Sequence, residues 1–111
     1  MPLAEFVRRL RPEARGAFLS LRALVVSLGA EVGEIVRRDG VEYRRRERTF
    51  LLVDVQRSRL LAIFPPDIPL PDPNGRLLRR GEKRYVALER ADDVDGHVQE
   101  FVRRAYLLAE G

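Results

Sequence analysis

Two short apolar runs in the middle of the chain constrain the fold more than any other feature. They are Phe50-Leu51-Leu52-Val53-Asp54-Val55 and Leu60-Leu61-Ala62-Ile63-Phe64, separated by a turn near Arg57-Ser58. Both runs are apolar on both faces for most of their length. As strands they belong in the centre of a sheet, with something covering each side.

Further strands are predicted on either side of this pair. Asp39-Gly40 stands between residues 34–37 and 41–44 and predicts a hairpin, because both residues tolerate a positive φ. In the second strand of that hairpin, Val41 and Tyr43 share one face while the intervening residues share the other. A last strand is predicted at about 84–88.

Residues 65–75 contain five of the seven prolines and end in the turn Pro73-Asn74-Gly75. Proline cannot donate to a strand ladder, so this segment is predicted to be a stiff, extended surface loop. We expect its Ile68 and Leu70 to pack over one face of the sheet.

Helices are expected at both ends. Pro12 suits the first turn of a long helix that ends before Gly29, and residues 3–10 predict a shorter helical segment ahead of it. The apolar stripe of the long helix is Phe18, Leu21, Leu24, Val25 and Leu28. Asp92 or Asp93 is predicted to cap a C-terminal helix whose inward stripe is Val94, Val98, Phe101, Val102, Ala105 and Leu108.

The chain is therefore predicted to be one α+β domain spanning residues 1–111. Its core is an antiparallel meander of about five strands, flanked by an N-terminal and a C-terminal helix packed on one sheet face. The absence of cysteine excludes disulfides and thiolate metal sites. The first residues lack the pattern of a secretory signal and no apolar run is long enough to span a bilayer, so we expect a cytoplasmic protein without a membrane partner.

Positive charge is concentrated in the predicted sheet. Twenty of the 21 basic residues are arginine. From Arg37 to Arg84 the chain contains thirteen basic and seven acidic residues. Guanidinium groups favour bidentate contacts with phosphate, so this region is a candidate surface for nucleic acid or another polyanion. The preference for arginine over lysine is equally typical of a GC-rich genome, although such a bias does not explain the clustering.

The candidate polyanion-binding residues flank the predicted strands, and two tyrosines among them offer rings on which single-stranded bases can stack. An alternative is that the arginines protect strand edges from aggregation. The candidates are Arg44, Arg45, Arg46, Arg48, Arg57, Arg59, Arg79, Arg80, Lys83, Arg84, Tyr43 and Tyr85.

No motif specifies a reaction. His97 is the only histidine and is expected to be an exposed helix residue, and the serines lie in no nucleophile motif. Asp93-Val94-Asp95-Gly96 resembles the start of a calcium loop but lacks the later ligands, which favours a capping role. Asp54 is expected to pair with an arginine. We therefore predict a protein without catalytic residues, cofactor or metal.

The order of elements carries a resemblance to known domains. A helix ending in Ser27-Leu28-Gly29 precedes a strand with Tyr43 and a strand centred on Phe50. The loop Asp72-Pro73-Asn74-Gly75-Arg76-Leu77 and a helix with Ala105-Tyr106 follow. This order is similar to a family of small α+β domains of unknown function, also found at the C-terminus of nuclease-like or transport proteins, and is distantly YdhG-like. The resemblance covers roughly residues 12–107 and implies a meander packed with two helices; it implies no activity and no catalytic residues.

Three hypotheses for function follow. The first is a non-enzymatic basic module that binds nucleic acid or another polyanion. The second is a protein-interaction module, most simply a homodimer, in which the central strands bury their second apolar face. The third is a ligand pocket around Asp54, Tyr43 and Tyr85.

Overall fold

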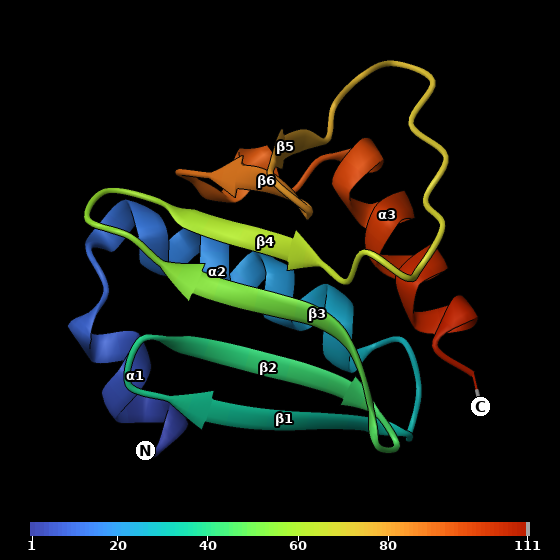
Figure 1. Cartoon of the computed structure of the whole chain (residues 1–111). Coiled ribbons are helices and arrows are strands. Elements are labelled where there is room, and N and C mark those ends of the chain that lie inside the picture. Colours follow the sequence, from blue (N-terminus) through green and yellow to red (C-terminus); the bar gives the residue numbers. More distant parts are fainter. Residues whose placement is uncertain (111) are drawn as a thin grey trace.

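The chain folds into a single sheet with helices on one side, as Figure 1 shows for the computed structural model, which describes residues 1–110. The elements in chain order are α1 (Leu3–Arg9), α2 (Pro12–Val26), β1 (Val32–Arg37), β2 (Gly40–Arg45), β3 (Arg48–Val55), β4 (Leu60–Phe64), β5 (Leu78–Arg80), β6 (Lys83–Leu88), the 3-10 turn η1 (Ala91–Asp93) and α3 (Gly96–Leu108).

The sheet is antiparallel throughout, and its strand order is β1-β2-β3-β4-β6-β5. The α+β class and the two flanking helices are confirmed, and β3 and β4 occupy the centre as predicted. The sheet has six strands rather than about five, because β5 pairs with β6 to form a hairpin. It is also not a simple meander: β6 returns to lie beside β4, and β5 forms the edge.

One face of the sheet, which we call the inner face, packs against the helices. In Figure 1, α2 runs behind β3 and β4 and α3 stands beside them. The fully buried side chains of the central strands join the same core cluster as the apolar stripes of α2 and α3. At about 25 cal/mol per Å² of apolar area removed from water, this burial is the main stabilising term of the domain. Its members on the strands include Val41, Tyr43, Phe50, Leu51, Val53, Leu60, Ala62 and Phe64.

A β-bulge in β3 explains how two successive residues are both buried. Tyr43 of β2 pairs with Leu51, and its neighbour Arg44 pairs with Thr49, so Phe50 has no partner on β2. Both Phe50 and Leu51 are fully buried. The ring of Phe50 meets that of Tyr106 on α3 edge-on, at 5.4 Å between ring centroids, so the bulge gives β3 an additional contact with the C-terminal helix.

The β1–β2 hairpin forms as predicted, but for a different reason. Among the described residues, only Arg46, Gly75 and Gly81 have a positive φ, so the Asp39-Gly40 turn does not use that conformation. Instead, a Cβ on Gly40 would lie 2.1 Å from the carbonyl oxygen of Val53. Glycine is needed because β2 and β3 approach closely at this point.

The C-terminal helix begins one turn later than predicted. Its N-cap is Asp95, whose side chain accepts a hydrogen bond from the backbone N–H of Val98 at 3.1 Å. Asp93 instead accepts from the N–H groups of Glu89 and Arg90 and closes the preceding 3-10 turn. Leu108, which was expected to extend the inward stripe, is exposed, whereas the other members of that stripe are buried.

The proline-rich loop packs on the helix side of the sheet, where Ile68 and Leu70 join the core cluster. Arg84 of β6 holds the loop by donating to the carbonyl oxygens of Pro65 and Ile68. Only the first residues of the loop, Pro65 to Asp67, border the second face of β3 and β4, beside Leu52 and Ile63. Within residues 1–110 no helix covers that face (Figure 1).

The close approach at Gly40 gives a stability prediction. Gly40→Ala should lower the free energy of unfolding by about 1–3 kcal/mol or more, because the new methyl group collides with backbone rather than with a flexible side chain. Gly33→Ala on the neighbouring strand is the matched control, since its Cβ would have 3.9 Å to the nearest atom. It should change the unfolding free energy by less than about 1 kcal/mol. Urea titrations of both variants test this, and equal midpoints would contradict it.

Candidate functional site

The second face of the sheet, which we call the open face, carries no helix (Figure 1). Strand register places one row of side chains across its middle, running from β1 to β5. Most of the row is apolar, and Leu52 and Leu78 are 38% and 47% exposed. A solvated face of an antiparallel sheet is normally polar, so this face differs from an ordinary water-facing one. The row is Ile35, Glu42, Leu52, Ile63, Tyr85 and Leu78.

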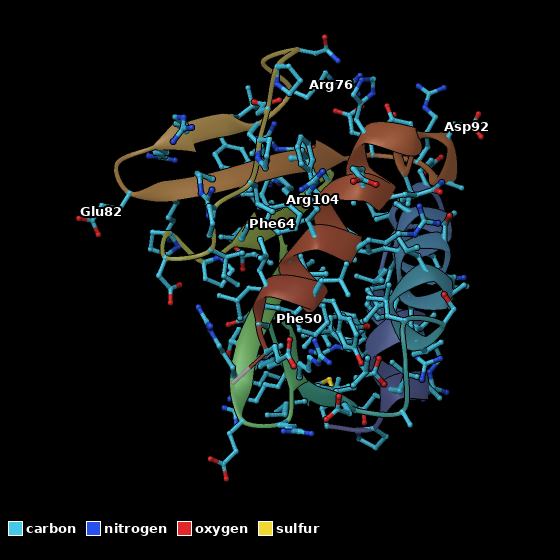
Figure 2. The ribbon with its side chains drawn as sticks, turned by 90° about the vertical axis from the view of Figure 1, so that its right-hand side faces the viewer. Phe50, Phe64, Arg76, Glu82, Asp92 and Arg104 are labelled. Atoms are coloured by element: carbon cyan, nitrogen blue, oxygen red, sulfur yellow. The ribbon has the colours of Figure 1, made fainter. Side chains whose placement is uncertain are left out.

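The open face is hollowed between the central strands, the β5–β6 hairpin and the start of the proline-rich loop. Figure 2 shows this hairpin, with Glu82 at its tip, projecting to the side of the sheet that faces away from the helices. Two adjoining hollows share Leu52, Ile63 and Lys83, and the larger has a volume of about 800 Å³. Their floor is apolar and their rim is charged.

The charge on the rim of the two hollows is balanced rather than basic. Five cations and five carboxylates line them: Arg37, Arg38, Arg48, Arg80 and Lys83 against Asp39, Glu42, Asp54, Asp67 and Glu82. The positive excess of the sequence between residues 37 and 84 is therefore not focused on this surface.

Two of the predicted polyanion-binding residues are inside the molecule. Tyr43 is fully buried and its hydroxyl donates to Glu34 at 2.8 Å, so its ring is not accessible to a base. Burial raises the pKa of this hydroxyl, and the bond to Glu34 raises it further. Arg84 is only 7% exposed, and its desolvation lowers the pKa of its guanidinium. Both side chains have structural roles.

Arg45 and Arg46 are paired with Glu31, whose pKa they lower by hydrogen bonding. Arg45 also donates to the carbonyl oxygen of Tyr106 at 3.1 Å and lies 4.5 Å from the centroid of that ring. It therefore ties the end of β2 to the last turn of α3. Arg46 occupies the turn between β2 and β3, with φ at 57°.

Arg48 likewise links separate segments, since it bonds Asp67 of the proline loop at 2.9 Å and the carbonyl oxygen of Leu108 at 3.3 Å. Arg57 and Arg59 lie in the β3–β4 turn, at the other end of the sheet from the β2–β3 turn. Arg59 donates to Gln56 within its own turn. The structure therefore does not bring the twelve predicted residues together on one surface.

The β5–β6 hairpin holds the remaining candidates. Arg79, Arg80 and Lys83 are exposed, and within residues 1–110 none of them forms an ion pair. Tyr85 lies on the open face opposite Ile63 and Leu78. Of the predicted set, Arg80, Lys83 and Tyr85 are the free side chains that contribute to the candidate surface, while Arg44 lies beside it bound to Glu42.

Glu42 is the most strongly bonded group of the open face. Its carboxylate accepts from Arg44 and from Arg37, each at 2.7 Å, and from the hydroxyl of Thr49. These bonds, led by those from Arg44 and Thr49, lower its pKa from 4.5 to about 2. A carboxylate held ionised in this way is poorly suited to accept a proton, so Glu42 organises the sheet rather than acting as a base.

Asp54 is also on the open face, half-buried at the edge of the hollow. The expected arginine partner is absent within residues 1–110, where its side chain forms neither a hydrogen bond nor an ion pair. Tyr43 lies behind the sheet, so the pocket expected around Asp54 and both tyrosines does not form.

His97 is exposed as predicted and sits outside this surface. Its two ring nitrogens lie 3.1 Å from Asn74 Nδ2 and 3.2 Å from Arg76 Nη1, and Arg76 pairs with Asp95 at 2.6 Å. This cluster fastens the loop before β5 to the start of α3. In the part of the chain that the structure describes, no group of three or more metal-ligating side chains comes together.

Comparisons add no relative: no protein-family model, curated protein or solved structure matches this chain. The resemblance to YdhG-like domains therefore stays a prediction. No helix within residues 1–110 combines the length and apolar character needed to cross a membrane.

Sequence reasoning recognised the second apolar face of the central strands but listed none of its residues as site residues, and it missed the β5–β6 hairpin. A signal for the floor was present, because Leu52, Leu61 and Ile63 alternate with the core-facing residues of two strands already recognised as apolar on both faces. The hairpin was hidden because β5 has only three residues, two of them arginine, although Gly81 marks its turn with φ at 61°.

The lowered pKa of Glu42 gives a prediction with a definite sign. A folded-state pKa below the unfolded value stabilises the fold above about pH 4.5 and loses that contribution as the pH falls towards 2. Glu42→Gln should therefore reduce the free energy of unfolding at pH 7 by about 1–3 kcal/mol, and by much less at pH 2. The measurement is urea unfolding of both proteins across this range.

Glu89→Gln is the matched control, because that exposed side chain forms no ion pair among the described residues. It should follow the wild type at every pH. A constant difference between wild type and Glu42→Gln from pH 7 to pH 2 would show that the carboxylate charge is not what stabilises the site.

Proposed function

We propose that this protein is a non-enzymatic protein-interaction domain that receives its partner on the open face of the sheet. The observation that carries the proposal is the apolar floor around Leu52, Ile63 and Leu78, which no helix within residues 1–110 covers. Apolar surface of this kind with a charged rim is typical of protein interfaces.

The charge distribution favours this function over polyanion binding. Most of the clustered arginines are bound to carboxylates or to backbone carbonyls and are therefore already engaged within the chain. The rim around the apolar floor is balanced in sign, whereas a surface for a polyanion needs a net positive field.

Leu52→Glu tests the proposal. The side chain points to the open face and is 38% exposed, so the variant should fold, with a loss of up to about 1 kcal/mol because the new carboxylate stands opposite Glu42. It should lose at least about tenfold in affinity for any protein that binds the wild type, because a charge then stands on the apolar floor. Affinity capture followed by titration of the captured protein measures this loss.

Leu107→Glu is the control, since Leu107 is 62% exposed on α3, away from the open face. It should bind like the wild type. Binding that survives Leu52→Glu would place the interface elsewhere, and a wild-type chain that binds no protein, itself included, would overturn the proposed function.

Polyanion binding is the second candidate, favoured by the absence of ion-pair partners for Arg79, Arg80 and Lys83 in the described part of the chain, with Tyr85 nearby. It predicts that labelled single-stranded DNA or RNA binds at physiological salt and that the double variant Arg80→Glu, Lys83→Glu reduces affinity at least about tenfold. Fluorescence anisotropy measures this. Binding that vanishes between low and physiological salt would leave the protein partner as the better explanation.

A further inference from the structure

We propose that the partner on the open face is a second copy of this chain, related by a two-fold axis that passes beside Ile63. This inference rests on the proposed function and adds the identity of the partner and the register of the interface. It is carried by the positions of the charged side chains that form no ion pair within residues 1–110 of one copy.

Asp54 and Lys83 lie symmetrically about Ile63. Asp54 on β3 is opposite Leu61, two residues before Ile63 on β4. On the other flank of β4, Arg84 pairs with Phe64. The preceding residue of β6, Lys83, therefore lies beside Pro65, two residues after Ile63. The two charges are thus diagonal across the middle of the open face, and both line the same hollow.

A two-fold axis in the plane of the interface exchanges these two positions. When one copy lies face to face on the other, residue i meets residue j and residue j meets residue i. An axis beside Ile63 therefore places Asp54 of each copy opposite Lys83 of the other, with the apolar floors stacked between the two pairs.

The charges around these two residues follow the same complementarity. Six side chains on the rims of the hollows have no ion pair among residues 1–110, and they form two groups. One group lies at the β1–β2 turn and the adjoining end of β3 and carries net charge −1; the other lies on the β5–β6 hairpin and carries +1. The first group is Arg38, Asp39 and Asp54, and the second group is Arg80, Glu82 and Lys83.

The shape of the face agrees with this pairing. The hairpin carrying Glu82 projects from the sheet on the open side (Figure 2). In the two-fold arrangement the hairpin of each copy lies beside the β1–β2 turn of the other, so Glu82 approaches Arg38 while Arg80 and Lys83 approach the two aspartates. Two hairpins then enclose the apolar floor from opposite sides and exclude water from it.

The experiment is a charge exchange read by molecular mass. The wild type should have twice the chain mass of 12.8 kDa by sedimentation equilibrium at micromolar concentration. D54K alone and K83D alone should each weaken self-association at least about tenfold, because each places like charges opposite one another twice in the interface. An equimolar mixture of the two variants should recover the wild-type affinity, since every contact then again joins opposite charges.

Controls separate this register from general charge effects. D92K changes an exposed carboxylate off the open face and should leave the dimer intact. Circular dichroism and urea midpoints confirm that the variants fold. A dimer that Leu52→Glu abolishes but the charge reversals leave unchanged, or a mixture that stays monomeric, would overturn the register.

A monomeric wild type at all concentrations would overturn the self-association. The proposed function would then be decided separately by whether Leu52→Glu, and not Leu107→Glu, removes binding of a different protein. Failure of the dimer and failure of the interaction surface therefore give different results.

Discussion

The structure depends on the burial of one face of two central strands against a single layer of helices. β3 and β4 are apolar on both faces, but the chain supplies helices, and the packed proline loop, to the inner face alone. Within residues 1–110 the helices all pack on the inner face, so no second layer forms on the other side of the six-stranded sheet. The apolar side chains of β3 and β4 that point away from the helices form the open face. The candidate site therefore exists because the hydrophobic core lies on one side of the sheet.

The arginines hold this architecture together. Arg22 bonds both carboxylate oxygens of Glu34 at 2.9 and 3.1 Å, and Arg45 contacts Glu31 while it also reaches the end of α3. Arg84 connects β6 to two carbonyls of the proline loop. A planar guanidinium presents five donors in a fixed fork and can hold a carboxylate by two parallel bonds, whereas the ammonium of a lysine has three donors and acts as a point charge. This gives the preference for arginine in the sheet a structural reason, whatever the genome contributes.

The sequence allowed the fold class and the central strands to be predicted, because side-chain alternation and turn residues report local structure directly. It did not reveal that Tyr43 is inaccessible. The prediction that Tyr43 and Val41 share one face was correct, but which face of the sheet meets the helices depends on packing over the whole sheet. The cap of α3 was misplaced because three aspartates stand within four positions, and the 3-10 turn that selects Asp95 depends on where β6 ends. Likewise, the ion pairs that occupy Arg45, Arg46 and Arg48 join segments far apart in the chain and follow no sequence spacing.

The single lysine of the chain lies on the β5–β6 hairpin, at the border of the open face. Amine-reactive labels and enzymes that acetylate or ubiquitinate lysine therefore find one side-chain target in this protein, where most proteins of this size offer several. Any such modification would neutralise or enlarge Lys83 and so alter the open face of the sheet.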